Sequence, residues 1–184
     1  MSAFSAFSSD FRKLTPTRQI LLGLIMLFAL ISGIGASYYF SLSNPPTQAL
    51  VYLKTSQKSP HKGDIVPITL SLDSKNTGIE AADFVVTFDP SFLSFQTLEK
   101  GSFFQTYPRT EIGENRLYIS AIATLKDDTV ILPKGKGDVA TILFVANKSG
   151  VTDITIDQKE TTVAVSGRNI ATYSPASIIK LSIL

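Results

Sequence analysis

The chain carries one long apolar run near its N-terminus, from Ile20 to Phe40, and no charged residue interrupts it. At about 1.5 Å of rise per residue, the run predicts a helix of roughly 31 Å, enough to cross the hydrocarbon core of a bilayer. Arg12, Lys13 and Arg18 precede it against a single acidic residue, a bias typical of the cytoplasmic side of a membrane. We therefore expect a single-pass membrane protein with a cytoplasmic N-terminus.

A cleaved secretory signal is the alternative interpretation, because small residues at positions 32–36 would suit a signal peptidase. The length of the apolar run and the 19 residues before it favour an uncleaved signal-anchor. Both interpretations export the rest of the chain. The expected organisation is a cytoplasmic tail (1–19), a transmembrane helix (20–40), a linker that contains Pro45 and Pro46 (41–48) and an extracytoplasmic domain (49–184).

The composition excludes several classes of site. The residues before Ile20 account for the whole net charge of +2, so the domain is neutral and has no electrostatic reason to bind nucleic acid. The absence of cysteine excludes disulfides, thiol catalysis and thiolate metal sites. His61, the single histidine, and the acidic pair Asp127-Asp128 are interpreted as residues of solvated turns. We expect no enzyme activity, no cofactor and no bound metal.

From Ala49 onward, apolar residues recur with a period of two, which predicts β-strands separated by Gly, Pro and Asn turns. Eight or nine short strands without a long helix favour an antiparallel β-sandwich. Pro67 cannot donate a ladder hydrogen bond, so its part of the strand is expected at an edge or a bulge. The expected strands are Leu50–Leu53, Ile65–Leu72, Phe84–Phe88, Leu117–Ala123, Ala140–Val145, Ile154–Ile156, Thr162–Val165 and Ile178–Leu184.

The most specific segment runs from Gly78 to Phe95. It has an alternating strand that ends at Phe88, an Asp89-Pro90 turn whose carboxylate can accept from backbone amides ahead of it, and a return to the core at Leu93. This segment resembles the signature of cohesin domains. Segments 53–68, 99–103, 137–145 and 166–184 resemble further cohesin motifs in the family's order. The resemblance covers about residues 49–184 and implies an all-β, nine-stranded jelly-roll sandwich.

Cohesins bind dockerin modules through one sheet face, and the resemblance implies which residues would do so here. Asp83 aligns with a position where many cohesins place a dockerin-contacting Asp, whereas Ala81 replaces the Asn that is common beside it. Thr124 stands near a position where an acidic contact is common. The implied partner-binding residues are therefore Asp83 and Thr124.

The function expected from these observations is that of a bacterial, membrane-anchored, surface-exposed module that binds a dockerin-type protein and tethers it to the cell. Two alternatives stay open. One is a carbohydrate-binding module linked to polysaccharide breakdown, in which Tyr107, Tyr118 and Tyr173 would supply aromatic contacts in a chain that lacks Trp. The other is a structural component of a surface assembly.

Overall fold

The computed structural model describes residues 15–43 and 48–184, and the chain divides into two compact units, Met1–Pro46 and Thr47–Leu184. The first unit contains the helix α2 (Pro16–Ser43), which is long and apolar enough to cross a membrane. Proline is well suited to the first turn of a helix, where its missing N–H leaves no bond unmade. Residues 1–14 of the expected tail and 44–47 of the expected linker lie outside the described residues.

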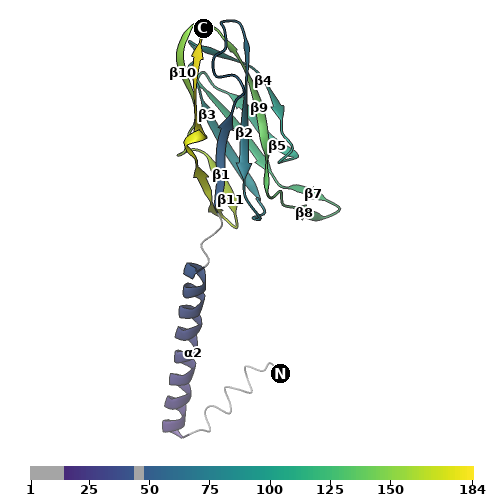
Figure 1. The fold of residues 1–184 in the computed structure, drawn as a ribbon. Helices are drawn as coiled ribbons and strands as arrows, with labels where there is room; N and C mark the ends of the chain where they lie inside the picture. The colour runs from purple at the N-terminus through teal and green to yellow at the C-terminus, as the bar shows by residue number, and fades with distance from the viewer. Residues whose placement is uncertain (1–14, 44–47) are drawn as a thin grey trace. The chain divides into compact units, whose positions relative to one another are not determined.

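The second unit consists of two main β-sheets and a small hairpin (Figure 1). The first sheet has the order β13-β1-β2-β9-β4. The second has the order β12-β11-β3-β10-β14, and β6 adds to β3 while β5 adds to β6. The strands of the first sheet are β1 (Ala49–Lys54), β2 (Ile65–Asp73), β4 (Leu93–Lys100), β9 (Lys136–Ala146) and β13 (Ala171–Tyr173). Those of the second are β3 (Ala81–Thr87), β5 (Thr106–Ile112), β6 (Arg116–Ile122), β10 (Gly150–Ile156), β11 (Thr162–Val165), β12 (Arg168–Asn169) and β14 (Ile178–Ile183); β7 (Thr124–Lys126) and β8 (Thr129–Ile131) form the hairpin.

The core lies between the two sheets and is made by alternate side chains of their strands. Phe84 of β3, Ile119 of β6 and Phe144 of β9 are completely buried in it. The Phe144 ring lies 4.9 Å from that of Phe88 and 6.4 Å from that of Phe95, centroid to centroid. This unit therefore has an apolar core of its own and needs no disulfide.

The sandwich of two sheets was predicted, and it is confirmed, but the expected count of nine strands is not. The described residues form fourteen strands, several of them only two or three residues long. One pairing also departs from the antiparallel rule, because β13 runs parallel to β1. Six strands were not predicted because they are short, exposed or irregular: β4, β5, β7, β8, β12 and β13.

Two local predictions are confirmed, one for Pro67 and one for the Asp89-Pro90 corner. Pairing of β1 with β2 ends at Lys54 opposite Thr69, so Pro67 lies where β2 has only β9 as a neighbour. At the corner, the Asp89 carboxylate accepts hydrogen bonds from the Ser91 backbone N–H at 2.9 Å and from the Ser91 hydroxyl at 2.6 Å. These bonds lower the pKa of Asp89.

Stability at acidic pH is expected to depend on Asp138, which joins β1, β2 and β9. Its Oδ1 accepts from Lys54 Nζ and from Ser71 Oγ, both at 2.7 Å, and these bonds lower its pKa from 3.8. A carboxyl whose folded pKa is lower than its unfolded pKa stabilises the fold above the unfolded value, and this contribution disappears as the pH falls through the folded pKa. Asp138→Asn should therefore destabilise the domain at pH 7 and much less at pH 2–3.

Urea unfolding of residues 47–184 and of Asp138→Asn at pH 7, 4 and 2.5 measures this dependence. The difference in unfolding free energy between the two proteins should shrink steadily toward the lowest pH. A difference that is independent of pH would show that the carboxylate charge contributes nothing at this position.

Candidate functional site

The outward face of β3, β6 and β5 brings together polar side chains from three strands. In the register of the ladder, Asp83 of β3 lies opposite Ser120 of β6, and Ser120 lies opposite Arg109 of β5. Side chains directly opposite one another on a sheet share a face and are within contact distance. We call this surface the β3–β6 face and define it by Asp83, Arg109, Arg116, Tyr118, Ser120 and Glu160.

Neighbouring side chains on this face fix one another's positions. The Ser120 hydroxyl donates a short hydrogen bond to the Asp83 carboxylate. The Arg109 guanidinium lies 5.2 Å from the centre of the Tyr118 ring, a cation–π arrangement, and donates to Glu111 at 2.6 Å. The hydrogen bond from Arg109 lowers the pKa of Glu111, and the same bond raises the pKa of Arg109. The face is thus charged, paired and ordered before any partner arrives.

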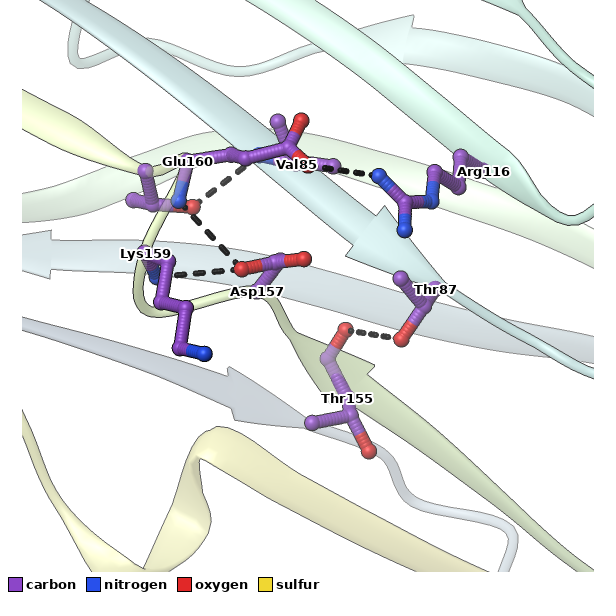
Figure 2. Close-up of polar contacts among 8 residues, drawn as sticks. Val85, Thr87, Arg116, Thr155, Asp157, Lys159 and Glu160 are labelled. Carbon is purple, nitrogen blue, oxygen red and sulfur yellow. Dashed lines mark hydrogen bonds and ion pairs between the residues drawn. The ribbon is translucent and has the colours of Figure 1, made fainter.

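The loop 157–161, between β10 and β11, passes over one edge of this face and is fixed to β3 (Figure 2). The Asp157 N–H donates to the Val85 carbonyl at 2.8 Å, and the Val85 N–H donates to the Thr161 hydroxyl at 3.1 Å. β3 pairs with β11 near its start and with β10 near its end, and Val85 stands between the two pairings. The loop therefore completes the hydrogen bonding of β3 where neither strand does.

The same loop places Glu160 beside the face. The Asp157 carboxylate accepts from the N–H groups of Lys159 at 3.0 Å and Glu160 at 3.3 Å, an Asx turn that sets the path of the loop. Glu160 Oε1 lies 2.6 Å from Arg116 Nη1 of β6, and this contact raises the pKa of Arg116 (Figure 2). Half-exposed ion pairs add little to stability, so this pair chiefly presents charge.

A shallow hollow lies on the face. It combines charged groups with one half-buried aromatic ring and a floor of core strand, which is the composition of many protein contact surfaces. Its lining comes from β3, β5, β6 and the loop 157–161, and comprises Asp83, Phe84, Val85, Arg109, Tyr118, Ile119, Ser120 and Glu160. Among the residues that the structure describes, no group of three or more His, Asp or Glu side chains could hold a metal ion.

The residues predicted from the sequence lie at different places. Asp83 is exposed at the centre of the β3–β6 face. Thr124 begins β7, beyond the end of β6, and its Oγ1 lies 3.3 Å from Thr106 Oγ1. Asp83 and Thr124 therefore belong to neighbouring parts of the surface and not to one row of the sheet.

The three predicted tyrosines do not form one platform. The Tyr107 hydroxyl donates to the Val139 carbonyl of β9, and burial raises its pKa. The Tyr173 hydroxyl donates to the Thr161 carbonyl at 2.9 Å, and burial raises its pKa as well. Tyr118 alone lines the hollow, and Arg109 covers its ring. Stacking of a sugar ring on Tyr118 would require Arg109 to move.

Three residues of the face were not predicted from the sequence: Arg109, Arg116 and Glu160. Arg116 was detectable, because it directly precedes the predicted strand Leu117–Ala123 and continues the alternation of Tyr118 and Ser120. Arg109 follows a proline in a segment without clear periodicity, and Glu160 reaches the site only through the loop. Only the pairing of strands brings these three residues to Asp83.

The chain is similar to known proteins of one family and one fold. The family model described as the Cohesin domain matches residues 51–179. No curated protein matches the chain. Among solved structures, the third cohesin of ScaC from Acetivibrio cellulolyticus, in complex with the ScaB dockerin, has a TM-score of 0.61 at 20% identity, covering 74% of this chain and 99% of that one.

Two further structures resemble the chain over similar lengths. CaCohA2 from Clostridium acetobutylicum has a TM-score of 0.63 at 13% identity, covering 75% of this chain and 92% of its own. The non-cellulosomal cohesin from the archaeon Archaeoglobus fulgidus has a TM-score of 0.57 at 8% identity, covering 74% and 91%. At identities of 20% or less, these structures show a shared fold. The family model shows the family, because it matches most of the sequence. The chain therefore belongs to the cohesin domain family.

Proposed function

We propose that residues 47–184 bind a dockerin-type protein module through the β3–β6 face. The observation that carries the proposal is the row Asp83, Ser120 and Arg109 across three strands of a cohesin domain. Cohesin domains are non-catalytic binding modules, and the ScaC cohesin and CaCohA2 are both recorded in complexes with dockerins. We also propose that the strands of the sandwich follow a jelly-roll topology, as the resemblance to cohesins implies.

The chemistry of the face supports a protein contact. Arginine and tyrosine are the residue types that contribute most to protein interfaces, and Arg109 stacks on Tyr118 in the hollow. Asp83 and Glu160 supply carboxylates that can accept from a partner's lysine, arginine or backbone amide. The side chains already pair with one another, so a partner exchanges existing hydrogen bonds for its own. Such an exchange gives specificity more than raw affinity.

We further propose that α2 is a signal-anchor, so that the bound partner is held at the outer side of the cell membrane. The helix has the length and hydropathy of a membrane span. The basic residues before it favour a cytoplasmic N-terminus.

Two experiments on cells that express the full chain test the anchor. Carbonate washing of their membranes should leave the protein in the pellet, and protease added outside intact cells should digest the domain. Release of the domain as a shorter soluble chain would instead indicate a cleaved signal.

Capture by the isolated domain tests the proposed partner. Immobilised 47–184 is incubated with purified dockerin modules encoded in the source genome, and in parallel with insoluble polysaccharides. Saturable binding of a dockerin, absent from a column that carries denatured domain, supports the proposal. Retention on polysaccharide without binding of any dockerin contradicts it and favours the carbohydrate-binding alternative.

Asp83→Ala is expected to weaken the dockerin complex by roughly 1–3 kcal/mol, the usual range for the loss of a hydrogen bond to a charged group. That range corresponds to a Kd about 5-fold to 150-fold higher, measured by isothermal titration calorimetry. Glu99→Ala is the matched control, because Glu99 is an exposed carboxylate on β4 of the other sheet. An unchanged Kd for Asp83→Ala would remove this carboxylate from the contact.

A further inference from the structure

Exposed apolar side chains gather on one small part of the domain. Of the ten large aliphatic residues that are exposed in the described part of residues 47–184, five lie between positions 122 and 132. These are Ile122, Leu125, Val130, Ile131 and Leu132, with exposed fractions from 39% to 66%. Single exposed aliphatic residues are ordinary on a protein surface, but residues that share one surface mark a contact site, and of these five Ile122 and Ile131 line the same groove.

The hairpin β7–β8 carries most of this group and projects from the sandwich (Figure 1). Asp127 and Asp128 form its two-residue turn with φ of 50° and 58°, the left-handed values that such tight hairpins require. The hairpin pairs with neither main sheet. A two-stranded hairpin is only marginally stable by itself, so an exposed apolar one gains most when a partner covers it.

One face of the hairpin forms a wall of a groove. Thr124 and Ile131 are paired in the register of the hairpin, and both line this groove. The next pair, Leu125 and Val130, points to the other face of the hairpin and does not line the groove. The other wall is the connection between β4 and β5, with Phe103 and Phe104. Ile122 and Pro133 complete the apolar lining. The groove therefore suits an apolar side chain of another molecule.

The charged groups of the groove are of one sign. Lys134 and Lys136 are its only charged lining residues, and both are exposed. Neither takes part in an ion pair within the described ranges 15–43 and 48–184. The Lys136 ammonium lies 5.8 Å from the centre of the Tyr52 ring of β1, so Lys134 is the cation that meets a carboxylate brought to the rim of the groove. Charge complementarity thus selects an acidic ligand.

The groove is continuous with the β3–β6 face. Ile122 and Ser120 lie on the same side of β6, and Ile122 is opposite Ala81, two residues before Asp83 on β3. A protein that contacts Asp83 and extends along β3 toward its start therefore reaches Ile122 and the groove.

We propose that the groove binds an apolar side chain of the partner protein, next to an Asp or Glu of that partner which pairs with Lys134. This inference rests on the proposed function, because the groove extends the same contact surface. The partner must therefore present an aliphatic or aromatic residue with an adjacent carboxylate, outside the segment that contacts Asp83.

The test compares substitutions on the two faces of the hairpin, with the dockerin from the capture experiment as the probe. Ile131→Ser and Lys134→Glu should each raise the Kd at least tenfold. Leu125→Ser, on the other face of the hairpin, and Ile65→Ser, an exposed residue of β2, should leave it unchanged. An Asp-to-Lys or Glu-to-Lys change at the partner's contact position should restore binding to Lys134→Glu. Thermal unfolding confirms that each variant is folded.

The outcomes separate the two proposals. Unchanged Kd values for Ile131→Ser and Lys134→Glu, with weakened binding by Asp83→Ala, would overturn the groove alone. An equal loss from Leu125→Ser would show a non-specific apolar contact and would also overturn it. Self-association of the free domain that Ile131→Ser abolishes would assign the groove to a second copy, against the proposal. Failure of every dockerin to bind the unmodified domain would overturn the proposed function and this inference together.

Discussion

Phe144→Ala is expected to lower the free energy of unfolding of residues 47–184 by about 3–5 kcal/mol. The side chain is completely buried on β9, and its ring packs against those of Phe88 and Phe95. Removal of the ring loses its transfer free energy and leaves a cavity between the sheets, which rigid strands on both sides cannot collapse to fill. A loss of this size is a large part of the stability of a typical domain.

Urea unfolding followed by circular dichroism measures this loss. Leu143→Ala is a matched control, since Leu143 neighbours Phe144 on the same strand but points away from the core and is only half-buried. The control should lose much less stability than Phe144→Ala. Equal losses from the two variants would mean that the space between the sheets is not the main source of stability.

Gly101→Ala is expected to destabilise the domain by about 3 kcal/mol, near the upper limit for overpacking of a tight site. A Cβ atom at Gly101 would lie 2.0 Å from the carbonyl oxygen of Asp138, which is backbone and cannot turn aside. The contact occurs where β9 bulges, at Val139, which the register of β2 with β9 skips. The Gly101 N–H donates to the Val139 carbonyl at 2.8 Å, and the Phe103 N–H donates to the Asp138 carbonyl at 3.0 Å.

The physical reason is that the methyl group would push the start of the β4–β5 connection away from this bulge and break both hydrogen bonds. A fall in Tm of roughly 10 °C is expected by calorimetry. Gly113→Ala is the matched control, because a Cβ there meets nothing closer than the Arg116 carbonyl oxygen at 3.5 Å. A Gly101→Ala protein as stable as Gly113→Ala would contradict the close approach.

Much of the sandwich was predictable because buried strands leave a strict alternation in the sequence. β1, β6 and β14, all expected from this pattern, bury every second residue. β5 was not predictable, since Pro108 interrupts it and most of its residues are exposed. In β4, a bulge between Phe95 and Thr97 shifts the alternation within the strand. Strands at edges and in hairpins bury too little to impose a pattern.

The site was predictable only in part, because its residues come from separate strands. Asp83 was found from its place in a family motif, while its neighbours Ser120 and Arg109 follow from the register of three strands. Register is set by the hydrophobic patterns of both paired strands and by turn geometry, so no single segment specifies it. The groove was missed for a related reason. Its lysines stand in a segment with the composition of a turn, and only the fold brings them to the same groove as Phe103.

The attachment of loop 157–161 to β3 has a consequence for how recognition evolves. Val85 uses both its N–H and its carbonyl on this loop, so the path of the loop is set by β3 together with the side chains of Thr161 and Asp157. The side chains of Lys159 and Glu160 do not determine that path, because it is their N–H groups that the Asp157 carboxylate holds. Single substitutions at these two positions can therefore change which partner is accepted while the backbone stays in place. Association then requires little new ordering, and related copies of the domain can diverge in specificity without losing stability.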